Sequence, residues 1–300
     1  MPEYAKKHHF VPQFLLRRFA DQNGRLMVHR VSTQQQYNST VRNLGHRNNG
    51  HTLYHPNHEP DHATLEEAMA QIEGDAASAV RELDGSRDRS ISLESRRALA
   101  WFLALQWQRS RFLLHAITRE AGEVSVNLSR QEIQGSFLRI VQRDVIWPWQ
   151  ARDDDDADPE ERFNYLVEVL LGRQWSCYRP RGGGLLVGDS TICFSGYVGR
   201  KPPQVPPGFF DHGVGCGLAD FRRMTVPLGT HLAVIISDDL SEVQRLDVAT
   251  LNRYTVFNSR EFVAHAPDWS HSASQLEVLL KVQRLVSPVF LRDYGAGGYA

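Results

Sequence analysis

Side chains suited to metal-assisted hydrolysis occur at several separate points of the sequence. His8 and His9 are adjacent, and an imidazole can activate water or bind a divalent ion. Eight of the 13 histidines fall within the first 62 residues, among Asn, Gln and Gly. We therefore expect His8 and His9 to be catalytic, with His9 also a metal ligand.

Carboxylates that could share an ion with these histidines lie further along the chain. Glu66 and Glu73 are seven residues apart, so on a helix they share a face about 10 Å apart and cannot chelate one ion together. Asp189 lies in a turn between two predicted strands. We expect His9, Asp189 and either Glu66 or Glu73 to hold Mg²⁺ or Mn²⁺, although both glutamates could instead neutralise arginines.

A polar pair interrupts the most apolar helix that the sequence predicts. Gln106 and Arg109 are three residues apart on it, and a buried guanidinium requires an acidic or carbonyl partner. Glu73, Asp189 or a substrate phosphate could supply that partner. We expect both residues to belong to the catalytic set and to meet the histidines and carboxylates in one cleft.

Two other polar clusters have simpler interpretations. His51, His55, His58 and His62 would align on a helix, but Pro56 and Pro60 exclude a regular one, so a solvent-facing loop is expected. The acidic run 153–156 could bind a hard cation, yet such runs are usually solvated loops.

The elements that must position these residues follow from periodicity and capping signals. Capping boxes start helices at Thr64 with Glu67, at Ser129 with Glu132 and at Asp158 with Glu161. The helix 92–118 is apolar nearly all round and should be the buried central helix. Helices are predicted over 14–19, 64–83, 92–118, 129–147, 158–171, 248–257 and 273–285. Strands are predicted over 25–31, 36–41, 174–178, 185–187, 191–194, 224–227, 231–237 and 261–265.

This order predicts an α+β fold in which a helical layer packs on a mostly antiparallel sheet from the C-terminal half. We expect one compact domain over 1–300, made of a His-rich hairpin segment (1–62), a helical part (63–172) and a strand-rich part (173–300). The segment 8–19 should dock on the central helix, because its phenylalanines need burial.

Composition limits the class of protein. The chain has 300 residues, 41% of them hydrophobic, and a formal charge of −1, which excludes a globally basic nucleic-acid coat. Three cysteines without metal-type spacing favour a reducing cytoplasm. The N-terminus has no apolar signal core, and the longest apolar stretch, 98–105, is too short for a bilayer, so neither export nor a membrane is expected.

Two resemblances follow from the N-terminal residues. The run His8-His9-Phe10-Val11-Pro12 resembles the His-His-x-x-Pro motif of HNH-type nucleases, in which an imidazole activates water beside a divalent ion. Those fingers continue as a hairpin and a short helix that bears a ligand. Here a helix is predicted directly after the motif, and 42–51 is expected to be a polar loop.

The whole chain resembles a mainly bacterial family described as domain of unknown function 4238. The run Lys7 to Phe19 (KHHFVPQFLLRRF) is similar to its signature, and the similarity continues through Leu65-Glu66, Ile72-Glu73, Gln106 with Arg109, and Leu251-Asn252. The family's Thr-Ser-Asp-Asn-Pro segment differs here, where Val187 to Thr191 keeps only the aspartate. The resemblance implies no settled activity, only that these polar positions recur together.

Two functions of different class remain open. The first is a metal-assisted phosphodiesterase or nuclease acting on nucleic acid or a nucleotide, in bacterial stress or anti-phage defence. The second is a non-catalytic binding or regulatory protein whose buried polar network fixes the packing of the N-terminal segment. Metal-dependent cleavage that is lost on His9→Ala would separate them. The sequence leaves the oligomeric state open.

Overall fold

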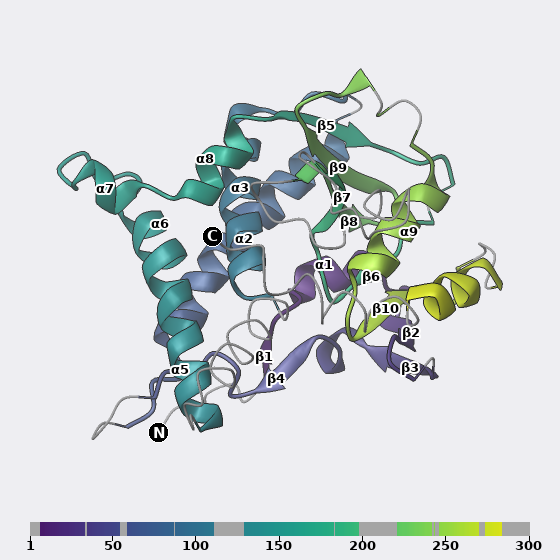
Figure 1. The fold of residues 1–300 in the computed structure, drawn as a ribbon, viewed down its shortest axis with the longest axis horizontal. Coiled ribbons are helices and arrows are strands. Elements are labelled where there is room, and N and C mark those ends of the chain that lie inside the picture. Colours follow the sequence, from purple (N-terminus) through teal and green to yellow (C-terminus); the bar gives the residue numbers. More distant parts are fainter. Residues whose placement is uncertain are drawn as a thin grey trace, which may run out of the picture. The chain divides into compact units, whose positions relative to one another are not determined.

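The computed structural model describes residues 7–33, 35–54, 59–86, 88–110, 129–182, 184–197, 221–241, 243, 246–269 and 274–283 (Figure 1). The chain forms two compact units, and each unit is built from three separate stretches of the sequence. The first unit comprises Met1–Pro12, Gly45–Glu82 and Leu93–Leu171, and the second comprises Gln13–Leu44, Leu83–Ser92 and Gly172–Ala300. The single domain over 1–300 stays a prediction.

A short two-stranded ribbon opens the first unit. Strand β1 (Lys7–His9) pairs antiparallel with β4 (His46–Asn48), and His9 lies opposite His46. The expectation of a polar loop over 42–51 was wrong for β4. Three residues are too few to show the alternation that marks a strand, and the partner strand is remote in sequence.

Two long helices of the first unit follow. Helix α2 (Thr64–Gly85) begins where predicted, but Asp61 caps it, because Asp61 Oδ1 accepts the N–H of Ala63 and of Thr64, each at 3.0 Å. Helix α3 (Leu93–Gln108) is buried around most of its circumference, as expected of the central helix, and it packs against α5 and α8 of the same unit. The helix ends at Gln108, short of the predicted residue 118, and residues 111–118 lie outside the described residues.

The helix predicted over 129–147 is interrupted. Helix α5 (Arg130–Val141) carries the predicted capping box of Ser129 and Glu132. A π-helical turn, η2 (Gln142–Ile146), then leads into α6 (Trp147–Ala151). Pro148 lacks an N–H, so the carbonyl of Asp144 has no helical donor and regular α-helical bonding stops here.

The helix predicted over 158–171 is two helices. Asp158 caps α7 (Pro159–Arg162) by accepting the Glu160 N–H at 2.8 Å. Phe163 is extended, and Asn164 then caps α8 (Tyr165–Leu171), because its Oδ1 accepts the Val167 N–H at 3.0 Å. The single predicted helix was wrong because an internal asparagine gives no clear stop signal in a periodic sequence.

The second unit holds two antiparallel sheets among the described residues. One has the order β3 (Gln36–Thr40), β2 (Arg25–Arg30), β10 (Phe262–His265), β6 (Val187–Gly188). The other has the order β5 (Gln174–Tyr178), β9 (Leu232–Ser237), β8 (Phe221–Gly229), β7 (Cys193–Tyr197). Helices and antiparallel sheets together confirm the predicted α+β class.

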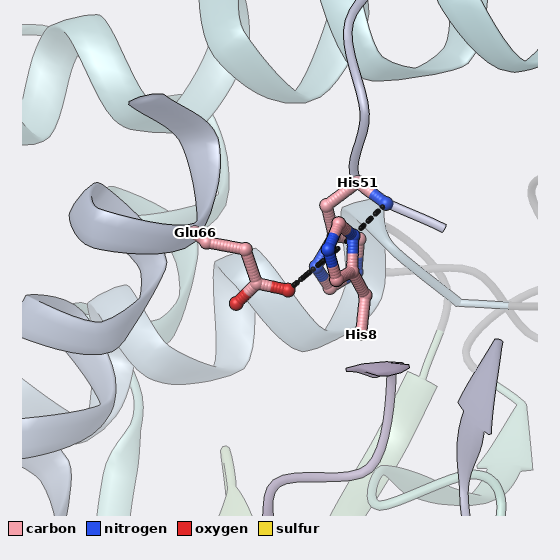
Figure 2. A group of neighbouring side chains, drawn as sticks. All are labelled: His8, His51 and Glu66. Atoms are coloured by element: carbon pink, nitrogen blue, oxygen red, sulfur yellow. Dashed lines mark hydrogen bonds and ion pairs between the residues drawn. The ribbon is translucent and has the colours of Figure 1, made fainter. Parts of the chain in front are cut away.

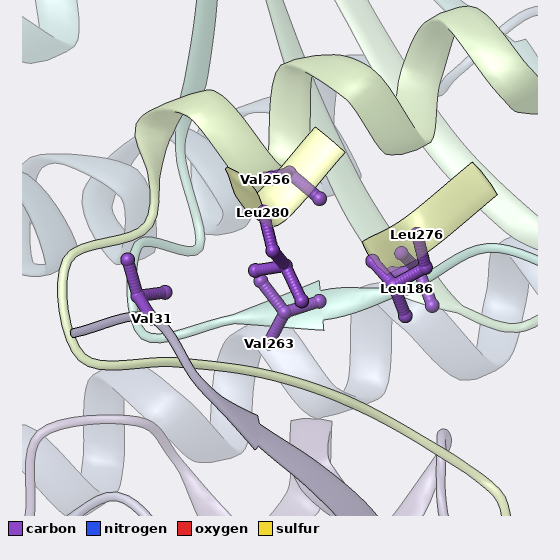
Figure 3. Close-up of a cluster of buried hydrophobic side chains, with 6 residues drawn as sticks. All are labelled: Val31, Leu186, Val256, Val263, Leu276 and Leu280. Carbon is purple, nitrogen blue, oxygen red and sulfur yellow. The ribbon is translucent and has the colours of Figure 1, made fainter. Parts of the chain in front are cut away.

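Helices complete the second unit. They are α1 (Gln13–Arg17), the 3-10 turn η1 (Val41–Asn43), α9 (Val248–Asn258) and a helical stretch over 274–283. Helix α9 contacts β6 and β7. A buried cluster shown in Figure 3 joins α9 and the stretch 274–283 to β10 and to the residues next to β2 and β6. It consists of Val31, Leu186, Val256, Val263, Leu276 and Leu280. None of the helices in the described part of the chain is both long and apolar enough to cross a bilayer.

Candidate metal centre

Three side chains of the first unit converge on one point (Figure 2). His8 comes from β1, His51 follows β4, and Glu66 lies in the first turn of α2. His51 Nδ1 lies 2.7 Å from Glu66 Oε1, and His8 Nδ1 lies 3.6 Å from the same oxygen. One potential ligand atom from each residue lies within 4.8 Å of the others. Of the predicted ligands, Glu66 is therefore in this group, and His8, predicted as catalytic, joins it.

The turn that carries His51 is held by backbone and side-chain bonds. Asn49 has a φ of 56°, a conformation that asparagine tolerates better than most residues, and it begins the turn after β4. Gln134 of α5 donates from Nε2 to the Asn49 carbonyl at 2.7 Å and to the Thr52 carbonyl at 3.4 Å. Both carbonyls flank His51, so α5 fixes the position of its backbone.

A close backbone approach holds β4 beside the His8-His9-Phe10-Val11-Pro12 segment. The Gly45 carbonyl accepts the N–H groups of Phe10 at 2.9 Å and Val11 at 3.2 Å. Gly45 has a φ of +67°, and a Cβ there would lie 2.9 Å from Val11 Cβ. Only glycine satisfies both conditions, so this residue allows the two ligand-bearing segments to meet.

The bonds among the three residues indicate their protonation. The backbone N–H of His51 donates to His8 Nδ1 at 2.7 Å, so a neutral His8 carries its proton on Nε2. Burial opposes the charge of Glu66, but the hydrogen bond from His51 and the charges of His51, His8 and Arg109 outweigh it and lower the pKa of Glu66. Glu66 is thus an anion beside two imidazoles.

The arrangement fits the ligand set of a divalent ion. Ligand atoms about 2.1 Å from one ion lie about 3 to 4 Å from each other, close to the 2.7 and 3.6 Å spacings here. His8 and His51 are buried, whereas the Glu66 side chain is 35% exposed, so the group opens toward solvent on the carboxylate side. An ion held there would keep a position open for water or substrate.

A buried ion pair lies next to this group. The Arg109 side chain is 1% exposed, and its Nη2 donates to Glu73 Oε1 at 2.6 Å. When the Gln106 amide is oriented so that its nitrogen and its oxygen both form hydrogen bonds, the nitrogen donates to the Phe10 carbonyl at 3.2 Å and the oxygen accepts from Arg109 Nε at 3.1 Å. The predicted burial of Arg109 and its pairing with Glu73 are confirmed. The bond between Gln106 and the Phe10 carbonyl also joins the N-terminal segment to α3, the helix on which that segment was expected to dock.

His9 takes a different position from His8. Successive residues of a strand point to opposite faces, so the two imidazoles diverge. The His9 ring lies 5.5 Å from that of His46, its partner in the ribbon. His9 is therefore not among the three converging residues.

Asp189 lies in the second unit, in the turn after β6. Its Oδ1 accepts the backbone N–H groups of Arg260 at 2.8 Å, Glu261 at 3.0 Å and Phe262 at 3.2 Å. Burial raises the pKa of Asp189 to about 6, against the lowering effect of those bonds. These contacts hold the strand connection before β10, and Asp189 is not among the three converging residues.

The sequence prediction missed His51. We expected a solvent-facing loop, but the residue is 5% exposed and lies at the centre of the group. The prolines exclude a helix, yet they do not exclude a buried turn before them. The Asn49-Gly50 pair is a strong tight-turn signal and could have shown that His51 follows a fixed turn. His55 and His58 lie outside the described residues.

Comparisons with known proteins identify a family without an assigned activity. No curated protein and no solved structure matches the chain. The model of the family described as Protein of unknown function (DUF4238) matches residues 7–268. This match covers the ribbon, the three converging residues, the Arg109 pair and Asp189. The chain therefore belongs to the DUF4238 family, in agreement with the resemblance seen in its sequence.

Proposed function

We propose that this protein is a metal-dependent hydrolase of phosphodiesters, with nucleic acid or a nucleotide as its substrate. The observation that carries the proposal is the convergence of His8, His51 and Glu66 at one half-open point. Two imidazoles and one carboxylate from three separate segments form a donor set known from catalytic metal sites. A divalent ion held there would supply a nucleophilic water and polarise a phosphoryl oxygen.

The donor set favours Mn²⁺ over Mg²⁺. Mg²⁺ prefers oxygen ligands in a strict octahedron and keeps several waters, whereas imidazole nitrogen suits transition metals. His8 and His51 contribute nitrogen, and Glu66 contributes the only oxygen of the three. Of the two ions expected from the sequence, Mn²⁺ is therefore the one we propose.

The surroundings favour an anionic substrate. Strand β1, which carries His8, reads KHH, and its partner β4 reads HRN, so the ribbon contains Lys7, Arg47 and three imidazoles but no carboxylate. Arg109 adds a positive charge that acts on Glu66. Its guanidinium is bonded to Glu73 and Gln106, so we assign Arg109 and Gln106 to positioning the ligand-bearing segments rather than to substrate contact.

The arrangement is similar in outline to the HNH pattern, because paired strands carry a histidine and the next helix carries a ligand. The strands here are not consecutive, and the helical ligand is Glu66. His9 and His46 lie on the other face of the ribbon, so their imidazoles do not point toward the three converging residues. A nuclease of this kind would serve bacterial stress or anti-phage defence.

Hydrolysis assays with a matched pair of variants test the proposal. Purified protein is incubated with Mn²⁺ and bis(p-nitrophenyl) phosphate, or with labelled DNA and RNA oligonucleotides. Glu66→Gln removes the charged ligand oxygen, whereas Glu67→Gln changes an exposed neighbour in the same helical turn. We expect cleavage by the wild type and by Glu67→Gln, and a loss of about 100-fold or more in Glu66→Gln. Equal cleavage by both variants would refute the proposal.

A specific contact favours the second candidate, a non-catalytic protein with a structural polar network. His8 Nδ1 already accepts the His51 N–H, so its lone pair serves the fold unless an ion displaces that bond. In this case Mn²⁺ would bind no more tightly to the wild type than to Glu66→Gln. Glu66→Gln would instead lower the free energy of unfolding, because a neutral amide oxygen accepts the His51 proton less strongly than a carboxylate does.

A further inference from the structure

The first unit also contains a recess, and none of its lining residues belongs to the candidate metal centre. It has a volume of about 690 Å³ and is walled by η2, α6, α7 and the start of α8. Figure 1 labels α6, α7 and α8 in this part of the first unit. Three aromatic side chains line it and are largely exposed: Trp147 at 54%, Phe163 at 55% and Tyr165 at 56%. Exposed aromatic groups gathered around one hollow are typical of binding surfaces.

Two hydrogen bonds of the Asn164 side chain hold the backbone around this recess. Pro148 leaves the Asp144 carbonyl without a helical donor, and the Asn164 side chain donates to that carbonyl from Nδ2. Oδ1 of the same Asn164 caps α8. One buried side chain thus ties the start of α8 to η2, and both Trp147 and Tyr165 line the recess between these elements. The π-helical turn lies directly against the recess, and such turns often mark functional sites.

The charge around the recess is strongly negative. Residues 143–171 contain nine carboxylates and three arginines. Arg143 pairs with Asp144 at 2.5 Å, Arg152 with Asp153 at 3.1 Å, and Arg162 lies 4.0 Å from Asp155. Glu160 and Glu161 line the recess, are exposed, and have no side-chain bond or ion pair within the described part of the chain. Their charges face solvent without a counter-ion among the described residues.

We propose that this recess, lined by Trp147, Phe163, Tyr165, Glu160 and Glu161, binds an arginine- or lysine-rich segment of a partner protein. Aromatic faces attract guanidinium and ammonium groups, and the two glutamates add ionic attraction at the same place. A nucleic-acid strand would also stack on the aromatic rings, but its phosphates would be repelled by the excess of carboxylates. The inference does not depend on the proposed hydrolase activity.

Fluorescence anisotropy with a labelled peptide of nine arginines tests the proposal, using the full chain in about 0.15 M NaCl. We expect Trp147→Ala to weaken binding about tenfold through the lost aromatic face. The double variant Glu160→Gln/Glu161→Gln should weaken it to a similar degree. Asp154→Asn/Asp155→Asn removes the same charge from residues that do not line the recess, and should change the affinity less than about twofold.

Several results would overturn the proposal. They are no binding of the peptide by the wild type, equal weakening by the two double variants, and preferential binding of a labelled oligothymidine at the same salt concentration. Concentration-dependent self-association that Trp147→Ala abolishes, without peptide binding, would assign the recess to a second copy of the chain instead. Trp147 is mostly exposed, so Trp147→Ala should fold like the wild type. An unchanged circular dichroism spectrum would show that any loss of binding is not caused by unfolding.

Discussion

Replacing Arg109 by methionine should destabilise the protein through the glutamate that it leaves behind. The guanidinium bonds to Glu73 at 2.6 Å and is buried, so the substitution strands a carboxylate against an apolar helix. Breaking a buried pair costs about 3 to 5 kcal/mol. The Glu73 side chain keeps 23% exposure, and water partly screens it, so we expect about 3 kcal/mol, at the lower end of that range. Urea unfolding followed by circular dichroism measures this loss.

Two further variants show whether the stranded charge is the cause. Arg143→Met removes a guanidinium that is 67% exposed, and it should cost less than about 0.5 kcal/mol. Adding Glu73→Gln to Arg109→Met neutralises the stranded carboxylate, and should recover at least about 1 kcal/mol. The reasoning fails if Arg109→Met unfolds at the wild-type urea concentration, or if the second substitution makes the protein still less stable.

Three other predictions concern stability. Gly45→Ala should cost about 2 kcal/mol in urea unfolding, because it combines a φ of +67° with a 2.9 Å approach to Val11; an unchanged midpoint would contradict this. Asn164→Ala should cost about 2 kcal/mol by removing two buried bonds, against a negligible cost for a surface Asn→Ala. Burial, and then His265, lower the pKa of His29 from 6.5 to about 4. The folded state therefore resists protonation, and stability present above pH 6.5 is lost as the pH falls toward 4. His29→Gln, which cannot titrate, should lose about 3 kcal/mol less than the wild type between pH 7 and pH 4, and parallel pH profiles would exclude the effect.

The tautomers of that histidine pair explain the direction of its shift. His265 Nδ1 lies 2.7 Å from the Ala266 carbonyl and donates to it, so its Nε2 is free to accept the proton of His29 Nε2 at 2.9 Å. His29 Nδ1 is buried and has no partner within the described residues. A second proton there would have no acceptor, which is why the neutral pair is favoured.

Local signals predicted much of the fold. The strand over 174–178 is found at the predicted residues, and the helix predicted over 248–257 extends by one residue. The Ser129 capping box is present, because reciprocal bonds across one turn need only the four residues that form it. These elements are long, or carry a complete local signal, so sequence periodicity and capping suffice to place them.

The candidate site was harder to predict because it depends on contacts remote in sequence. Strand β4 has three residues and exists only through its pairing with β1. His51 acquires its position from that pairing and from Gln134 on α5, neither of which a local pattern contains. The need of Arg109 for an acidic partner could be predicted, since a buried guanidinium requires one, but the choice of Glu73 over Asp189 depended on contacts remote in sequence.

Calorimetric titration with Mn²⁺ tests the central claim, the metal centre, most directly. The wild type and Glu67→Gln should each bind one Mn²⁺ per chain at His8, His51 and Glu66, with heats that disappear when a chelator is present. Glu66→Gln should bind at least about tenfold more weakly, because it loses the anionic ligand while keeping both imidazoles. Wild-type protein that takes up no stoichiometric Mn²⁺, or Glu66→Gln that binds it as tightly as Glu67→Gln, would contradict the assignment of these residues as a metal site.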